Sequence, residues 1–194
     1  MMKKYIIPFG VVVSVIVATH LFLSSFYKER MEEEKIMLAN EQGKVRYSEW
    51  SFSLFTNVVG QSLDKGLWKH DADTVSVDDC MSYPCLLIYV PPMENLCISC
   101  VNYAISSVQE IYGNEWGSSQ IGILTCGYNG ELKERILKKK VYSVEKDMFA
   151  IKNFNNPVYL LVGKDKKIIS SFMPYEVMEG WTNEYLKSVR SLLK

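Results

Sequence analysis

Short apolar runs alternate with helical patterns in the second half of the chain. Residues 85–90 (CLLIYV) and 121–126 (IGILTC) are continuous apolar runs of strand length, a pattern typical of strands buried on both faces. Residues 157–163 and 167–173 are also largely apolar, and the KDK between them has the length of a hairpin turn. We therefore predict four strands here, the last two of them antiparallel.

Apolar residues at helical spacing separate these strands. In the first helical segment they recur at intervals of one helical turn up to a stop near Gly113. These residues are Val101, Ala104, Ile105, Val108 and Ile111. Residues 130–142 predict a second helix and residues 181–193 a third. Because helical crossovers link the first strands, they should be parallel, so we predict an α/β fold with a central mixed sheet flanked by helices.

The start of the chain has a different pattern. From Tyr5 to Tyr27 no residue carries a formal charge, and a helix of that length can cross a hydrocarbon core of about 30 Å. Lys3 and Lys4 precede the run, and the segment after it leans acidic. The positive-inside bias therefore predicts a single-pass anchor over residues 1–27 with a cytoplasmic N-terminus and an extracytoplasmic, periplasmic body. The alternative is a cleaved signal peptide, although no A-x-A-like site closes the run.

Residues 28–79 link the anchor to the strand-rich half. Residues 28–45 are charged and helix-favouring, which predicts a juxtamembrane helix or stalk. Residues 46–79 carry short alternating apolar stretches broken by Gly and Asp, which predicts two or three short strands. We place one domain over residues 46–194.

The composition of the chain limits the kinds of partner and ligand that we expect. Hydrophobic residues make up 48% and charged residues 23%, a balance typical of globular proteins. Lys+Arg 22 equals Asp+Glu 22, so no basic field favours nucleic acid. With only two histidines, a histidine-rich metal site is not expected.

Five cysteines follow the predicted anchor: Cys80, Cys85, Cys97, Cys100 and Cys126. An exported body permits disulfides, and the odd number leaves at least one thiol outside a stable pair. A zinc site built from the first four is disfavoured, because Cys85 and Cys97 flank one strand and lie about 17 Å apart. We expect no metal, and we predict a structural disulfide between Cys80 and Cys85, with ordinary buried thiols as the alternative.

The order of elements, with Cys97 and Cys100 just after the strand at residues 85–90, resembles the thioredoxin fold. Pro157, directly before the antiparallel pair, strengthens the resemblance. The N-terminal anchor and the KDKKII segment look like the membrane-anchored TlpA/ResA-like branch of thiol–disulfide oxidoreductases. The resemblance covers roughly residues 50–194. It implies that the bond before Pro157 is cis, that Pro157 stands against the dithiol and blocks metal binding, and that the backbone of Asn156 pairs with a substrate chain.

The CxxC spacing suits a redox switch. Cys97 would open a helix, where unpaired N–H groups and the helix dipole favour a negative charge. The pKa of Cys97 should therefore be lowered, which makes it the attacking thiolate, and Cys100 should resolve the mixed disulfide. By family resemblance we expect reduction of disulfides in partner proteins, recharging by an unidentified thiol donor, and no cofactor.

The chain also departs from the family pattern. Ile98 and Ser99 stand where typical members carry a proline between the cysteines, and Leu96 replaces an aromatic residue. The strand before the CxxC lacks the family's buried acid, and Glu94 is the nearest candidate for proton transfer, if it is not simply an exposed loop residue. Cys126 is either a third redox cysteine or, as we favour, a buried small apolar residue.

Two other functions stay open. A non-enzymatic thioredoxin-like binding or scaffold module would use the CxxC disulfide only to fix a loop. A peroxiredoxin-like peroxidase needs a Thr or Ser and an Arg near its reactive cysteine. The segment before Cys97 offers Glu94 and Asn95 instead.

Overall fold

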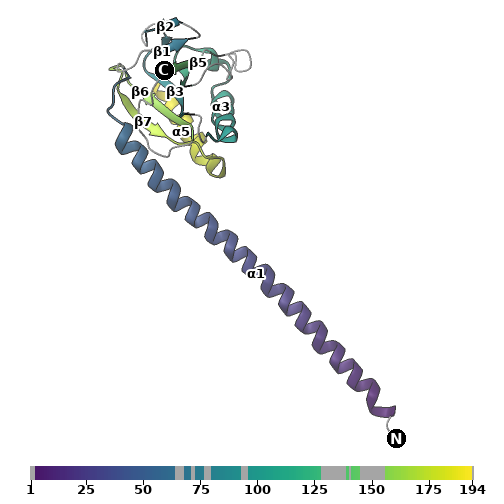
Figure 1. Cartoon of the computed structure of the whole chain (residues 1–194). Helices are drawn as coiled ribbons and strands as arrows, with labels where there is room; N and C mark the ends of the chain where they lie inside the picture. Colours follow the sequence, from purple (N-terminus) through teal and green to yellow (C-terminus); the bar gives the residue numbers. More distant parts are fainter. Residues whose placement is uncertain are drawn as a thin grey trace. The chain divides into compact units, whose positions relative to one another are not determined.

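The structure is a computed structural model. It describes residues 3–63, 68–70, 73–76, 80–92, 96–127, 139, 141–144 and 156–193, with the backbone alone for residues 3–20, 70 and 73. By packing, the chain divides into two units, Met1–Glu49 and Trp50–Lys194. Figure 1 gives the labels of the elements.

Helix α1 (Lys3–Val58) forms the first unit, and its end, from Trp50 on, belongs to the second. From Lys3 on, the predicted anchor and the predicted stalk lie within this one helix. Among the residues that the structure describes, no helix is both long and apolar enough to cross a membrane. The predicted anchor falls largely on residues 1–20, whose side chains lie outside the description.

The prediction of strand structure from residue 46 is wrong as far as residue 58, because α1 continues to Val58. Leu54 and Val58, one helical turn apart, are buried, while Phe52 and Phe55 are exposed. The apolar residues here follow a helical period that short alternating stretches conceal. The helix ends just before Gly60, whose positive φ of 87° favours glycine.

In the described residues, the second unit is built on a seven-stranded sheet in the order β2-β1-β5-β4-β3-β6-β7 (Figure 1). The strands are β1 Trp68–His70, β2 Asp73–Val75, β3 Cys85–Val90, β4 Ile121–Cys126, β5 Val141–Val144, β6 Val158–Val162 and β7 Ile168–Phe172. β3 runs parallel to β4, and β4 to β5, while the remaining pairs are antiparallel. The mixed α/β sheet and the four strands predicted in the second half are confirmed.

Strand β5 corrects the predicted second helix. Residues 130–138 and 140 of that helix lie outside the described residues, but Val141 and Tyr142 are in a strand paired with Ile123 and Leu124. The side chains of Tyr142 and Val144 are buried, whereas those of the two alternate residues are half-exposed. Burial with a period of two identifies a strand, so the parallel part of the sheet has three strands in the described residues.

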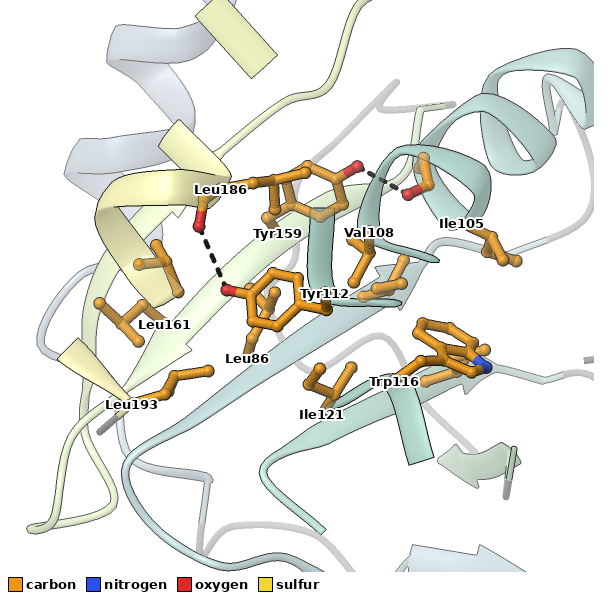
Figure 2. Close-up of a cluster of buried hydrophobic side chains, with 14 of the residues drawn as sticks. Leu86, Ile105, Val108, Tyr112, Trp116, Ile121, Tyr159, Leu161, Leu186 and Leu193 are labelled. Carbon is orange, nitrogen blue, oxygen red and sulfur yellow. Dashed lines mark hydrogen bonds between the residues drawn. The ribbon is translucent and has the colours of Figure 1, made fainter. Parts of the chain in front are cut away.

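Among the described residues, two helices cover the sheet face that carries Leu86, Ile88 and Val90. These helices are α3 (Ile98–Tyr112) and α5 (Glu179–Leu192). A short 3-10 helix, η3 (Gly113–Gly117), follows α3, and another, η4 (Glu176–Met178), precedes α5. Figure 2 shows the shared core, in which Tyr112 and Leu186 meet between the helices. The predicted first and third helices are therefore confirmed.

Buried tyrosine hydroxyls tie these layers together. Tyr112 donates to the carbonyl oxygen of Leu186 at 3.3 Å, and Tyr159 on β6 donates to that of Ala104 at 2.7 Å (Figure 2). Because a buried hydroxyl without a partner is unfavourable, these bonds favour one position of α3 and α5 on the sheet. They hold α3, and with it the first turn that carries the cysteine pair.

Candidate active site

Three strand ends meet at one edge of the sheet. Val90 at the end of β3 is in register with Thr125 of parallel β4, and Tyr89 pairs with Val158 at the start of antiparallel β6. The segment after β3 leads into α3, and Pro157 directly precedes β6. Ligand and catalytic sites of open α/β sheets collect at the carboxyl ends of parallel strands, so a catalytic site is expected at this edge.

Cys97 and Cys100 form a disulfide, with their Cα atoms 5.2 Å apart. Cys97 is the N-cap residue of α3, and its Sγ accepts a hydrogen bond from the backbone N–H of Cys100 at 3.3 Å. The hydroxyl of Ser99 lies 3.4 Å from the same sulfur. Ile98, between the cysteines, is 69% exposed. The disulfide therefore lies at a helix end that solvent and other molecules can reach.

The N-cap position gives Cys97 a specific electrostatic environment. The first N–H groups of a helix have no partner within the helix, and an acceptor side chain at the N-cap bonds the N–H of the second or third residue. Cys97 does this through sulfur, at the third residue. After reduction its thiolate would be a charged acceptor at the positive end of the helix dipole. The first turn of α3 contains no acidic residue that would oppose this charge.

The chain after Cys100 anchors the pair to the core. Val101 and Ala104 are buried in the cluster beneath α3, and Leu96 packs against that cluster from the other side of the cysteines. The cysteine pair thus lies between two apolar contacts with the core.

Pro157 is buried at the start of β6, at the edge where β3 ends. Asn156 before it donates through its side-chain amide to the sulfur of Met173 at 3.6 Å, on the segment that follows β7. In the described residues the cis peptide bond is Tyr83–Pro84. The expectation of a cis bond before Pro157 is therefore wrong, and the roles assigned to Asn156 and Pro157 stay predictions.

The predicted disulfide between Cys80 and Cys85 is also wrong, since both residues are thiols. Cys85 is the first residue of β3, wholly buried and paired with Val162. Burial raises the pKa of its thiol to about 12. The backbone of Cys80 is engaged elsewhere, because its carbonyl oxygen accepts from the hydroxyl of Tyr142 at 3.4 Å.

Cys126 ends β4 at the predicted edge, but strand alternation separates it from α3. Ile121 and Ile123 belong to the cluster beneath α3. Because side chains alternate along a strand, Thr125 shares their face and Cys126 faces the other way. Cys126 is also buried, with 3% of its surface exposed. These observations favour the interpretation of Cys126 as a small apolar core residue.

Sequence reasoning treated Ser99 only as a departure from the family pattern and missed its contact with Cys97. A hydroxyl residue two positions after a helix-capping cysteine was the available signal. Glu94, the candidate acid, lies outside the described residues.

Comparisons with known proteins add the following findings. No family model matches the chain, and no curated protein matches it. A thioredoxin-like protein of uncharacterised function from Porphyromonas gingivalis is 18% identical, with 71% of this chain and 94% of that chain covered and a TM-score of 0.42. A candidate thiol:disulfide interchange protein DsbE from Chlorobium tepidum is 10% identical, with 68% and 96% covered and a TM-score of 0.43.

A mutant of PrxQ from Xylella fastidiosa is 10% identical, with 70% of this chain and 97% of that chain covered and a TM-score of 0.39. At these identities and TM-scores, no activity transfers to this chain. The fold class of this chain is instead assigned from its own structure. The evidence is the strand order, the cysteine pair at the start of the helix that follows β3, and the antiparallel pair β6–β7. These features define a thioredoxin-like α/β fold.

Proposed function

We propose that this chain is a thiol–disulfide oxidoreductase whose redox centre is the Cys97–Cys100 pair. The observation that carries the proposal is the disulfide at the N-cap of α3, where the N–H of Cys100 points at the Cys97 sulfur. A structural staple needs neither an accessible position nor donors aimed at one sulfur. A nucleophilic thiolate needs both.

The proposed reaction is reduction of a disulfide in a partner protein. The thiolate of Cys97 attacks one partner sulfur, which forms a mixed disulfide and releases the other partner sulfur as a thiolate that takes up a proton. Cys100, as a thiolate, then attacks the Cys97 sulfur, which releases the second partner thiol and closes the Cys97–Cys100 disulfide. Two electrons pass to the partner, and a donor dithiol protein returns them by the same exchange in reverse.

The location is a further part of the proposal. We place residues 1–27 in a membrane with the N-terminus in the cytoplasm, and the domain from residue 46 on the opposite side. The support is the uncharged stretch from Tyr5 to Tyr27 with Lys3 and Lys4 before it. The full-length protein should resist extraction from membranes by alkaline carbonate, whereas a chain lacking residues 1–27 should be released. Extraction of the full-length protein would overturn this part alone.

Trapping tests the reaction. Cys100→Ala removes the resolving thiol, so mixed disulfides with partners should accumulate through Cys97 and disappear on treatment with a reductant. The double variant Cys97→Ala/Cys100→Ala should trap nothing, and Cys126→Ala should behave as the native chain does. If the Cys100→Ala chain forms no such species in its own membrane or cell extract, the oxidoreductase proposal fails and the binding-module alternative gains.

A further inference from the structure

We propose that the part of α1 between Met31 and Val45 pairs with the same part of a second copy of this chain, as a short parallel coiled coil. This inference goes beyond the proposed function, because the redox chemistry takes no part in it. It assigns a partner to apolar side chains that lie on the surface of the first unit.

Exposed apolar residues recur along α1 at intervals of seven positions. Met31, Leu38 and Val45 are 56%, 60% and 57% exposed, and Phe52, the next residue of the series, is 70% exposed. Residues seven apart lie on one line of a helix with 3.5 residues per turn, which is the repeat of a left-handed coiled coil. We call the line of Met31, Leu38 and Val45 the seam.

Within the described residues, the seam faces solvent. Tyr47, which is buried, stands two positions after Val45 and therefore on the opposite side of the helix. A row of exposed large apolar side chains marks an interaction surface. The repeat of seven also selects the kind of partner, because a second helix follows such a line over several turns only if it has the same repeat. A second copy of α1 meets this condition at every position of the seam.

The charged residues beside the seam fit a parallel pair. Lys44 immediately precedes a seam residue, and in a parallel pair this position lies opposite that of Glu49 in the second copy. Glu34 would lie beside Lys35 of the second copy, with Arg30 one helical turn earlier in its own chain. Arg30 and Lys35 of the second copy carry like charges, and Glu34 lies between them and offsets both.

Two acidic residues limit the strength of the pair. Glu34 and Glu41 stand three positions after successive seam residues, where the second apolar residue of each heptad is usual. Lys44 donates to Glu41 at 2.6 Å within the same helix, which offsets part of this charge. We therefore expect a weak dimer. Its parallel direction rests on the proposed location, since an anchor over residues 1–27 holds the helices of neighbouring copies in the same direction.

The first test is sedimentation equilibrium of the full-length protein in density-matched detergent. The native chain should show a reversible equilibrium between monomer and dimer. Leu38→Glu should raise the dissociation constant about tenfold to a hundredfold, because each copy loses an apolar contact and adds a charge. Ile36→Glu is the matched control and should change the constant less than about twofold, since Ile36 is 63% exposed but lies on the opposite side of the helix.

The second test strengthens the pair. Glu34→Leu/Glu41→Leu completes the apolar repeat and should lower the dissociation constant at least about tenfold. Glu33→Leu/Asn40→Leu adds two leucines one position earlier, away from the seam, and should leave the constant within about threefold of the native value. The matched pair separates a specific seam from a general increase in apolar surface.

The third test is the direction of the pair. Leu38→Cys and Val45→Cys, oxidised in membranes, should each give a dimer linked through the introduced cysteine, because equal positions face each other in a parallel pair. Mass spectrometry locates the link, and the native chain gives the background of its own cysteines. An antiparallel pair brings at most one of the two positions opposite itself.

Three results would overturn the inference. These are a native chain that stays monomeric at every concentration, equal effects of Leu38→Glu and Ile36→Glu, and a link at only one of the two introduced cysteines. None of them bears on the Cys97–Cys100 pair, so the oxidoreductase proposal is decided separately.

Discussion

Cys85, the first residue of strand β3, and Cys97, beyond the other end of that strand, have the same side chain in opposite environments. Cys85 begins the strand, is fully buried, and has a thiol whose pKa burial raises to about 12. Cys97 follows the other end of the strand, caps α3, and has two hydrogen-bond donors on its sulfur. Burial without donors disfavours a thiolate, and a helix N-cap with donors favours one. The position in the fold therefore decides which thiol can act as a nucleophile.

The largest effect should come from removing the nucleophile. Cys97→Ala should reduce disulfide-exchange activity to the background rate, because no other thiol of the described residues combines exposure with a helix N-cap. Reduction of a synthetic disulfide peptide, followed by thiol release, measures this. Cys85→Ala serves as the control and should retain activity; equal losses in both variants would remove the distinction between the two cysteines.

The second-largest effect should be the difference between the alkylation rates of Cys97 and Cys85 at a fixed pH. At pH 8 a thiol with a pKa of about 12 is ionised in about one molecule in ten thousand, and burial also blocks access to Cys85. In the reduced, folded protein Cys97 should therefore be modified at least about a thousandfold faster than Cys85. In denaturant the difference should vanish, and its persistence there would contradict an origin in the fold.

The buried thiol should matter more for stability than for activity. Cys85→Ser places a hydroxyl in an apolar strand and should lower the free energy of unfolding by about 1–3 kcal/mol, as measured by urea unfolding. Disulfide exchange of the folded fraction should be unchanged. Cys85→Ala, which removes the sulfur without adding a polar group, is the matched variant and should retain more stability than Cys85→Ser.

The smallest effect is expected at Cys80. Its side chain is half-exposed and no disulfide joins it to Cys85, so Cys80→Ser should change the free energy of unfolding by less than about 0.5 kcal/mol. A disulfide between the two would instead contribute about 2–4 kcal/mol. If Cys80→Ser lowered the free energy of unfolding by that amount under oxidising conditions but not after reduction, a disulfide between Cys80 and Cys85 would be shown to form.

Residues buried on both faces of a strand were the most predictable part of the fold. The apolar runs at β3, β4 and β6 and the helical spacing of Val101, Ala104 and Val108 specify the central sheet and α3 without reference to distant contacts. The CxxC then falls at the junction of a strand and a helix.

Elements that depend on distant partners were not predictable in the same way. β5 has four residues, and its identity depends on pairing with β4. The helical stretch near Leu54 has its apolar residues among exposed phenylalanines, which conceals the period. Cys80 and Cys85 are near in sequence, but their pairing depends on the directions of side chains that the turn and strand determine. The contact of Ser99 with Cys97 likewise required the geometry of the N-cap.

The most direct test of the central claim is redox titration of the full-length protein against glutathione. The account predicts one reversible two-electron transition that involves Cys97 and Cys100 alone, is lost in Cys97→Ala/Cys100→Ala, and is unchanged in Cys126→Ala. A disulfide that stays closed across the whole titration, or a transition that survives the double substitution, would contradict it.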